Sequence, residues 1–308
     1  MITACGTAAE PEAPHTSPAV VATEGVTVPS EPGSPWVDAV AVRELGDGGR
    51  IVDVRVPCEA LGTEQAVKIY EPPGLPEAGA VPVVYLFHGQ NENEKMWQDL
   101  GLFTVVESLV ASGAVEPLLV VTPDIDNSFG VNNTESEVFD IPDGPSVSYD
   151  GNDYEDSLAE DLIAFVDGSY PTITDASGRY VGGISMGGFA ALHLAFRRPD
   201  LFSRVGAHSP ALVTDPEFTW LYPHDMPAEQ RNPLLLAAHA DLGDLEIRLD
   251  VGEQDEWGFF EPTRELATVL TERGASVEFH PAPGGHGFGY WGPNLEAYVR
   301  FYAAGLEG

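Results

Sequence analysis

Apolar and polar positions along the chain follow two different periods, which predict strands and helices in alternation. Residues 50–56 and 66–70 alternate apolar with polar side chains on either side of a turn at Gly62, as expected of an antiparallel hairpin. Short apolar runs that are typical of buried strands follow at residues 83–87, 118–121, 180–184, 247–251 and 277–279. Apolar residues spaced by three and four positions predict helices at residues 102–109, 158–166, 187–196 and 263–270.

These elements together favour one class of fold. Strands that alternate with helices of this length imply right-handed crossovers between parallel neighbours. The 308 residues and an apolar content of 43% supply enough material for one large core. We therefore expect an α/β fold: a three-layer sandwich with a mostly parallel sheet and an N-terminal antiparallel hairpin.

Two segments depart from this pattern. Residues 1–35 are rich in Ala, Pro, Thr, Ser and Glu and have no regular period, so we interpret them as a flexible tail or stalk and assign residues 36–308 to a single domain. Residues 124–157 are rich in Asp, Asn, Gly and Pro, which predicts a long surface excursion. Its carboxylates do not have EF-hand spacing, so a solvated acidic face is the favoured interpretation; calcium binding or a cover over the cleft are the alternatives.

The first residues suggest a location for the protein. The run Ile-Thr-Ala-Cys at residues 2–5 is similar to a bacterial lipobox, whose cysteine becomes the lipid-bearing first residue of the mature chain. Only Met1 precedes this run, so the charged and apolar parts of a signal peptide are missing. We therefore expect a precursor that starts upstream, and a protein that is secreted or anchored at the cell surface through Cys5. No apolar run approaches the roughly 20 residues that a membrane-spanning helix needs.

The charge of the chain excludes one class of partner. It carries 49 acidic and 14 basic residues, for a formal charge of −35, and Lys68 and Lys95 are its only lysines. A nucleic acid would meet net repulsion and no cluster of basic side chains, so we expect no nucleic-acid partner, and anionic membrane surfaces are disfavoured for the same reason. The two cysteines, Cys5 and Cys58, are too few for a disulfide scaffold.

The motif Gly183-Ile184-Ser185-Met186-Gly187 lies where a predicted buried strand gives way to a predicted helix. In this context G-x-S-x-G is typical of a nucleophile elbow, in which the serine sits on a strained turn between small neighbours. The helix that follows points its N-terminal amides at charge that develops beside the serine. Ser185 is therefore the candidate nucleophile, and the Met186 N–H is a candidate oxyanion donor.

A serine nucleophile requires a base, and the chain offers eight histidines. His286 is the favoured base, because it lies in a glycine-rich loop just past the last predicted strand, from which its ring can reach Ser185. His208, at a strand end, is a weaker rival. Of the remaining histidines, His193 and His280 are interpreted as structural.

The base in turn requires an orienting acid. Residues 249–256 leave a predicted strand and enter a loop between the serine and His286 in the sequence, and the order serine, acid, histidine is that of an α/β hydrolase. Asp255 is the favoured acid because it follows the turn at Gly252. Glu253, at the strand exit, and Asp250, inside the strand, are the alternatives.

A second oxyanion donor is expected from the segment that ends the strand at residues 83–87. A His-Gly turn at this place presents the next backbone N–H to a carbonyl oxygen, so Gln90 is the candidate. His88 itself is interpreted as a hydrogen-bonding support of the turn.

With these residues in place, the chain resembles the esterase D-like branch of the α/β hydrolases, which includes feruloyl and acetylxylan esterases, enterochelin esterases, S-formylglutathione hydrolases and mycobacterial mycolyltransferases. The resemblance runs from the hairpin to the C-terminal region, at residues 87–89, 154–170, 183–188, 198–202, 252–255, 284–286 and 290–291. It implies a serine esterase with Ser185, Asp255 and His286 as the triad, Gln90 and Met186 as the oxyanion donors, and neither cofactor nor metal. Gly287, where relatives often carry a polar residue, and the excursion at residues 124–157 are departures that leave substrate choice open.

The chemistry of the flanking residues narrows the substrate class. Lys95 is the basic residue nearest the oxyanion segment, so an anionic substrate would lack a partner and neutral esters fit better. Trp97, Trp257, Phe288 and Trp291 flank the catalytic segments and are candidates for stacking on an aromatic or sugar ring, with core packing as the alternative. The connection at residues 210–234 is short for a lid domain, which favours an open cleft for bulky or polymeric substrates.

Three functions are compatible with these residues. The favoured one is a serine carboxylic ester hydrolase that forms an acyl-enzyme on neutral carbohydrate-linked or aryl esters, whether small molecules or attached to a polysaccharide. Acyl transfer to a sugar hydroxyl would use the same triad. A catalytically silent surface binding module is the third, and the intact set of Ser185, Asp255 and His286 speaks against it.

Overall fold

The computed structural model describes residues 37–75, 81–133, 137–140, 146–149, 151–213 and 227–306. The predicted tail at residues 1–35, with the proposed lipid-anchor residue Cys5, lies outside the described residues. Parts of the acidic excursion, and residues 214–226 of the connection at 210–234, also lie outside them.

Within the described residues, one nine-stranded sheet forms the centre of the fold, in the order β1-β2-β3-β5-β4-β8-β9-β10-β11. Pairing is antiparallel from β1 through β2 and β3 to β5, and parallel from β5 through β4, β8, β9 and β10 to β11. The strands are β1 (Ala41–Glu44), β2 (Arg50–Cys58), β3 (Thr63–Glu71), β4 (Val83–Phe87), β5 (Leu119–Pro123), β8 (Arg179–Ile184), β9 (Arg204–His208), β10 (Glu246–Gly252) and β11 (Ser276–Ala282). A separate hairpin pairs β6 (Glu137–Asp140) with β7 (Ser146–Tyr149).

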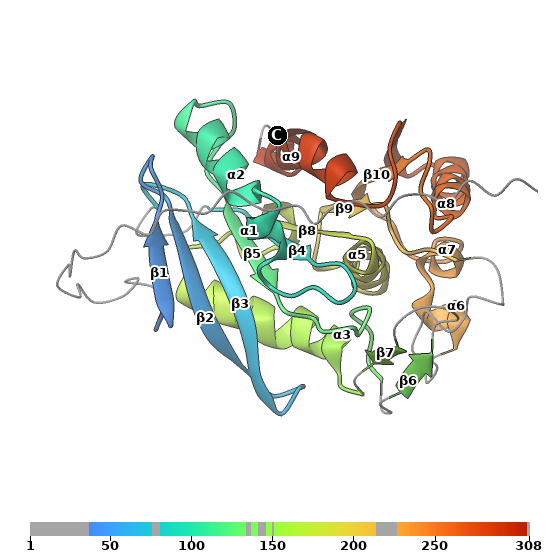
Figure 1. Ribbon diagram of the computed structural model, residues 1–308, viewed down its shortest axis with the longest axis horizontal. Helices are drawn as coiled ribbons and strands as arrows, with labels where there is room; N and C mark the ends of the chain where they lie inside the picture. Colours follow the sequence, from blue (N-terminus) through green and yellow to red (C-terminus); the bar gives the residue numbers. More distant parts are fainter. Residues whose placement is uncertain are drawn as a thin grey trace, which may run out of the picture. The chain divides into compact units, whose positions relative to one another are not determined.

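Helices cover both faces of this sheet (Figure 1). In β4, Val83, Tyr85 and Phe87 belong to one apolar cluster, whereas Val84 and Leu86 belong to another, because successive side chains of a strand point to opposite faces. The first cluster includes side chains of α4, α5 and α8; the second includes side chains of α1, α2 and α9. The helices are α1 (Met96–Asp99), α2 (Leu102–Ala111), α3 (Tyr154–Asp156), α4 (Ile163–Ser169), α5 (Met186–Arg197), α6 (Ala228–Arg231), α7 (Pro233–Leu236), α8 (Phe260–Glu272) and α9 (Phe288–Ala303), with a π-helical segment η1 (Ser157–Leu162) and the 3-10 turns η2 (Ala176–Gly178) and η4 (Ala304–Leu306).

This architecture is the expected three-layer α/β sandwich, with a mostly parallel sheet and an N-terminal antiparallel hairpin. The expected hairpin corresponds to β2 and β3, and the five expected apolar runs correspond to β4, β5, β8, β10 and β11. The helix expected at residues 158–166 is in part a π-helix that continues into α4. None of the described helices is long and apolar enough to span a membrane.

The acidic excursion is less exposed than its composition predicts. Ile125 and Phe129 are buried in the core, and Glu155 near its end is buried as well. The solvated-face interpretation, which concerned the carboxylates of residues 124–157, is therefore wrong for Glu155, whereas Asp126, Asp153 and Asp156 are exposed. Among the described residues, no group of three or more His, Cys, Asp or Glu side chains is arranged to hold a metal ion.

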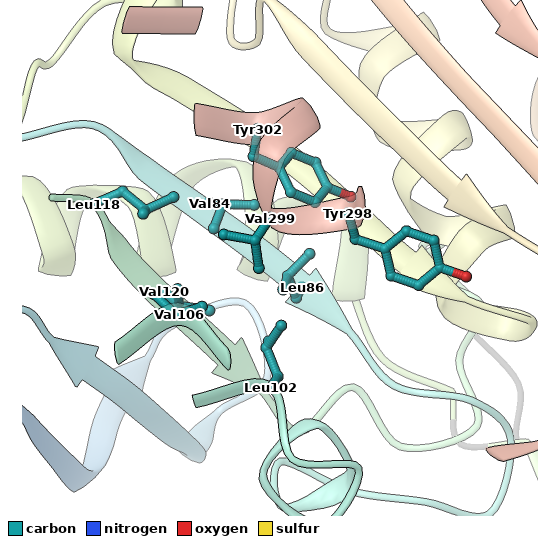
Figure 2. Close-up of a pocket in the computed structure, with 9 residues that line it drawn as sticks. All are labelled: Val84, Leu86, Leu102, Val106, Leu118, Val120, Tyr298, Val299 and Tyr302. Atoms are coloured by element: carbon teal, nitrogen blue, oxygen red, sulfur yellow. The ribbon is translucent and has the colours of Figure 1, made fainter. Parts of the chain in front are cut away.

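A small apolar cavity lies between the sheet and the pair α2 and α9 (Figure 2). Its volume is about 10 Å³, roughly the space of a single water molecule. A cavity of this size holds no substrate, so it is a packing gap within the core. Its lining residues are Val84, Leu86, Leu102, Val106, Leu118, Val120, Tyr298, Val299 and Tyr302.

Candidate active site

Ser185 occupies a strained turn between β8 and α5. Its backbone has φ 55° and ψ −116°, a conformation that non-glycine residues rarely adopt. A Cβ on Gly183 would lie 2.2 Å from the Gly187 carbonyl, and a Cβ on Gly187 would lie 2.3 Å from the Phe87 carbonyl oxygen. Both positions therefore require glycine, and the geometry is that of the predicted elbow.

Three side chains that are distant in sequence form a hydrogen-bonded chain at this turn, here called the Ser–His–Asp chain. Ser185 Oγ lies 2.9 Å from His286 Nε2, and His286 Nδ1 lies 2.8 Å from Asp255 Oδ2. The Asp255 carboxylate accepts the Nδ1–H, which leaves the lone pair of Nε2 facing the serine hydroxyl. The second oxygen of Asp255 accepts the Trp257 N–H at 3.0 Å.

The loops that carry Asp255 and His286 are joined by further hydrogen bonds. Gln254 Oε1 accepts the Gly284 N–H at 2.8 Å, and Glu256 Oε2 accepts the His286 N–H at 2.8 Å. The Gln254 N–H also donates to the Gly284 carbonyl at 2.9 Å. The side chains on either side of Asp255 therefore hold the backbone of the loop at residues 283–287, which carries His286 and is here called the histidine loop. No motif in the sequence assigns a role to Gln254 or Glu256, although both adjoin the predicted acid.

Two aromatic rings enclose the imidazole. The Phe259 ring packs edge-on against His286 with the ring centroids 5.2 Å apart, and Trp291 does the same at 4.9 Å. Trp291 in turn donates its Nε1–H to Ser209 Oγ at 3.1 Å. The imidazole is therefore held between a carboxylate, a serine and two apolar surfaces.

The predicted oxyanion segment lies against the nucleophile. A Cβ on Gly89 would lie 3.7 Å from the Cβ of Ser185, so the backbone of this turn passes directly beside the serine. His88 is fully buried, and its Nε2 accepts the Ile125 N–H at 2.9 Å, in agreement with a supporting role. Met186 is the first residue of α5, where an amide has no partner inside its own helix. The Gln90 and Met186 amides remain predictions as oxyanion donors.

The rival histidine and the rival acid form a pair of their own. His208 Nδ1 lies 2.6 Å from Asp250 Oδ2, and both side chains are buried. The alternative acid Glu253 bonds the Ala282 carbonyl through its backbone N–H. His193 is buried against Glu155, whereas His280 is exposed beside Glu278.

The four aromatic residues predicted to bind substrate fall into two groups. Trp97 is fully buried and donates its Nε1–H to the Phe87 carbonyl at 3.2 Å, so the prediction that it contacts substrate is wrong. Trp291 is also buried, with 6% of its surface exposed, and its ring contacts His286 instead of an open face. Trp257 and Phe288 are 50% and 44% exposed, and a contact with substrate remains a prediction for them.

Comparison with known proteins identifies the family. A family model described as "Putative esterase" matches residues 58–302. The chain belongs to this esterase family. Its relatives include an endo-1,4-beta-xylanase/feruloyl esterase of Xylanibacter ruminicola, which is 28% identical over 191 residues; the match covers 58% of this chain and 25% of that protein. The chain thus spans about a quarter of the length of that curated relative.

Solved structures place the chain in the α/β-hydrolase fold. A ferulic acid esterase superposes with a TM-score of 0.70 at 24% identity, covering 84% of this chain and 99% of that one. An S-formylglutathione hydrolase of Staphylococcus aureus superposes with a TM-score of 0.66 at 15% identity, covering 83% and 99% of the two chains. Both likenesses concern the fold, which this chain shares over more than four fifths of its length.

Proposed function

We propose that the protein is a carboxylic ester hydrolase that works through an acyl-enzyme at Ser185. The observation that carries the proposal is the unbroken hydrogen-bonded chain from Ser185 Oγ through His286 to Asp255, located at a strained strand-to-helix turn. His286 Nε2 takes the hydroxyl proton as the oxygen attacks the ester carbonyl, and later gives it to the leaving alcohol. Asp255 holds the ring in the required tautomer and stabilises the imidazolium that forms.

Deacylation would use the same groups in the reverse sense. After the alcohol leaves, a water molecule takes its place beside His286 Nε2 and loses a proton to it while attacking the acyl carbonyl. The proton returns to Ser185 Oγ as the acid product departs. The backbone amides of Gln90 and Met186 would stabilise the oxyanion in both steps, and each donor is worth about 3 kcal/mol in reactions of this kind.

The charges around the site support neutral esters as substrates. Glu256 lies within hydrogen-bond distance of the His286 backbone. Lys95 is paired with the neighbouring Glu94 at 3.6 Å and is 57% exposed. An anionic acyl donor would therefore meet the Glu256 carboxylate beside the histidine, while Lys95 is already paired with a carboxylate of its own. The exposed rings of Trp257 and Phe288 would instead offer stacking surfaces for an aryl or sugar group. Such esters agree with the feruloyl esterase names of the relatives.

Replacement of the nucleophile tests the proposal. Ser185→Ala should reduce the turnover of p-nitrophenyl acetate by on the order of 10⁴-fold or more and leave the melting temperature nearly unchanged. Ser276→Ala, at an exposed position on β11, is the matched control and should keep full activity. Full turnover by the Ser185 variant would refute the assignment.

The substrate class is tested separately on the wild-type protein. A panel of methyl ferulate, acetylated sugars and short-chain aryl esters, assayed side by side, should give the highest kcat/KM for neutral carbohydrate-linked or aryl esters. An anionic thioester such as S-formylglutathione should be a poor substrate. A preference for the anionic thioester would contradict the substrate proposal while leaving the nucleophile assignment intact.

A further inference from the structure

A buried polar cluster lies behind the active site, on the face of the sheet that α9 covers. It consists of Asp250 on β10, His208 on β9, and three tyrosines of α9: Tyr290, Tyr298 and Tyr302. We refer to it as the Asp250 cluster. Its members belong neither to the Ser–His–Asp chain nor to the predicted oxyanion segment, and the proposed chemistry gives none of them a task.

Hydrogen bonds converge on the Asp250 carboxylate from two elements. His208 Nδ1 lies 2.6 Å from Oδ2, and the hydroxyl of Tyr298 donates to Oδ1 at 2.8 Å. The Tyr290 hydroxyl also donates to Oδ1, at 3.3 Å. Tyr302 Oη lies 3.1 Å from His208 Nε2, and the rings of His208 and Tyr298 stack with their centroids 3.5 Å apart. Because an unpaired buried charge is costly, these contacts fix α9 against the ends of β9 and β10.

The environment of the three tyrosines favours their neutral form, in which each hydroxyl can donate a hydrogen bond. Burial is the main cause that raises the pKa of Tyr298 well above its ordinary value, and the nearby charge of Asp250 raises it further. The same two causes raise the pKa of Tyr290 and of Tyr302. These phenols therefore stay neutral at pH values at which a free tyrosine would begin to ionise, and they keep their hydroxyl protons for hydrogen bonding.

The Asp250 cluster is joined to the nucleophile through the backbone. The His208 carbonyl accepts the Ser185 N–H at 2.9 Å. The next residue, Ser209, donates its N–H to the Asp250 carbonyl at 2.7 Å. The strained turn at Ser185 is thus bonded to the same residue whose imidazole binds Asp250.

The cluster is joined to the base through the first turn of α9. That helix begins at Phe288, two residues after His286. A Cβ on Gly284 would lie 2.7 Å from the Tyr290 ring, so Tyr290 packs directly on the histidine loop. Trp291 packs against the imidazole and is held by Ser209. A shift of α9 relative to β9 would therefore move His286 relative to Ser185.

We propose that the Asp250 cluster positions the catalytic groups: by fixing α9 to the ends of β9 and β10, Asp250, His208, Tyr290 and Tyr298 set the distance between His286 and Ser185. They are positioning residues, since none of them lies among the groups proposed to react. The inference rests on the proposed esterase function. Reactions of this kind lose rate steeply when the reacting groups are displaced, by up to about 100-fold for about 1 Å.

Tyr298→Phe and Tyr290→Phe test this role, because each removes one donor to Asp250 and keeps the ring. Tyr70→Phe is the matched control: Tyr70 is a buried tyrosine in the same apolar cluster, and its hydroxyl donates to a buried carboxylate, Glu107, at 2.7 Å. Both kinds of variant lose one buried tyrosine–carboxylate hydrogen bond. They should therefore lose similar stability, which thermal melts will measure.

The cluster variants should differ from the control in their kinetics. With p-nitrophenyl acetate, kcat should fall about tenfold in Tyr298→Phe while KM stays within about twofold, and the rate of Ser185 labelling by a fluorophosphonate should fall in parallel. Tyr290→Phe should show a smaller loss of the same kind, since its hydrogen bond is longer. Tyr70→Phe should keep both constants within about twofold of the wild type.

A spectroscopic measurement reads the position of the base without turnover. The proton shared between His286 Nδ1 and Asp255 should give a resonance far downfield in the proton NMR spectrum of the wild type. It should be broadened or lost in Tyr298→Phe and kept in Tyr70→Phe. Should Tyr298→Phe not fold, Tyr290→Phe carries both measurements.

Two results would overturn the inference. One is an unchanged kcat and an unchanged downfield proton in the cluster variants; the other is an equal loss of kcat in Tyr70→Phe, which would mean general loosening of the core. Continued turnover by Ser185→Ala would instead disprove the proposed function, so the two failures are distinguishable.

Discussion

At the scale of single residues, the site depends on hydrogen-bonding side chains beside Asp255 and on glycines beside Ser185, which have no side chain. Ser185 can adopt its strained conformation because Gly183 and Gly187 have no Cβ. A Cβ at either position would collide with the backbone of a neighbouring segment. Asp255 acts in company with its neighbours, since Gln254 and Glu256 bind the histidine loop on either side of it. Three consecutive side chains therefore engage one loop, and each has a separate hydrogen bond to lose.

Glu256 gives the prediction at this scale. Glu256→Ala should lower kcat about fivefold with little change in KM, because the His286 N–H loses its acceptor and one hydrogen bond is worth about 1 kcal/mol. Glu256→Gln keeps a carbonyl acceptor and should keep most of the activity. Glu253→Ala is the control, because it removes an exposed carboxylate from the same loop and leaves the acceptor of the His286 N–H in place. Equal kinetics for Glu256→Ala and Glu253→Ala would show that the bond does not position His286.

At the scale of elements, a buried ionic cluster ties the end of the acidic excursion to the helix behind the elbow. Glu155 of α3 lies 3.0 Å from His193 Nε2 and 2.9 Å from Arg197 Nε, both on α5. Burial raises the pKa of Glu155, but the hydrogen bonds and charges of His193 and Arg197 outweigh it, and the net pKa is lowered. The folded protein therefore favours the ionised form of this carboxyl.

The direction of this shift predicts how stability depends on pH. Because the folded pKa of Glu155 lies below the unfolded value, near 4.5, its stabilising contribution is present above that value and is lost as the pH falls through the lower folded pKa. Glu155→Gln should lower the free energy of unfolding by about 2 kcal/mol at neutral pH, and the difference should shrink under acid.

Urea unfolding of the wild type and the variant, from about pH 7 down to about pH 2.5, measures this difference across the folded pKa. The control is Glu160→Gln. Glu160 lies on η1, directly after α3; its side chain is 69% exposed, and its Oε1 lies 3.7 Å from Arg198 Nη1. Its effect should be small at every pH. A Glu155→Gln difference that does not change with pH would contradict the assignment of the shift to this cluster.

At the scale of the whole molecule, the charge of −35 sets the conditions under which this fold is stable. So many like charges repel one another in the compact state more than in the unfolded chain. The described ion pairs offset only part of this, since most of the carboxylates have no cation to meet among 14 basic residues. Salt in the solvent should screen the remainder.

The melting temperature should therefore rise with ionic strength. Between about 0.01 M and about 0.15 M NaCl the screening length falls from about 30 Å to about 8 Å, and a gain of about 1 kcal/mol would raise the melting temperature by about 3 °C. Calorimetry in NaCl and in KCl at matched ionic strength measures the effect. Equal rises in the two salts indicate screening, whereas a fall, or no change, would contradict it.

Much of the fold could be predicted from the sequence, because period and run length are local properties. The five apolar runs became β4, β5, β8, β10 and β11, and the alternating segments became β2 and β3. Helix α9 was missed, although Trp291, Leu295, Tyr298 and Tyr302 are spaced by three and four positions. Gly292 and Pro293, both poor helix formers, interrupt this pattern near the start of the helix.

For the site, the sequence by itself determined the turn at Ser185, since strand, glycines and helix are adjacent in the chain. Only the tertiary structure decided which acid meets which histidine. Ile247, Leu249 and Val251 face one side of the sheet, so Asp250 faces the other, where His208 and α9 lie, whereas Asp255 leaves the strand and reaches His286. The sequence also left burial undecided. Trp97 and Trp257 are the same residue type and each flanks a catalytic segment, yet packing encloses Trp97 and leaves Trp257 half exposed. Contacts between distant segments fix these outcomes, and no local pattern encodes them.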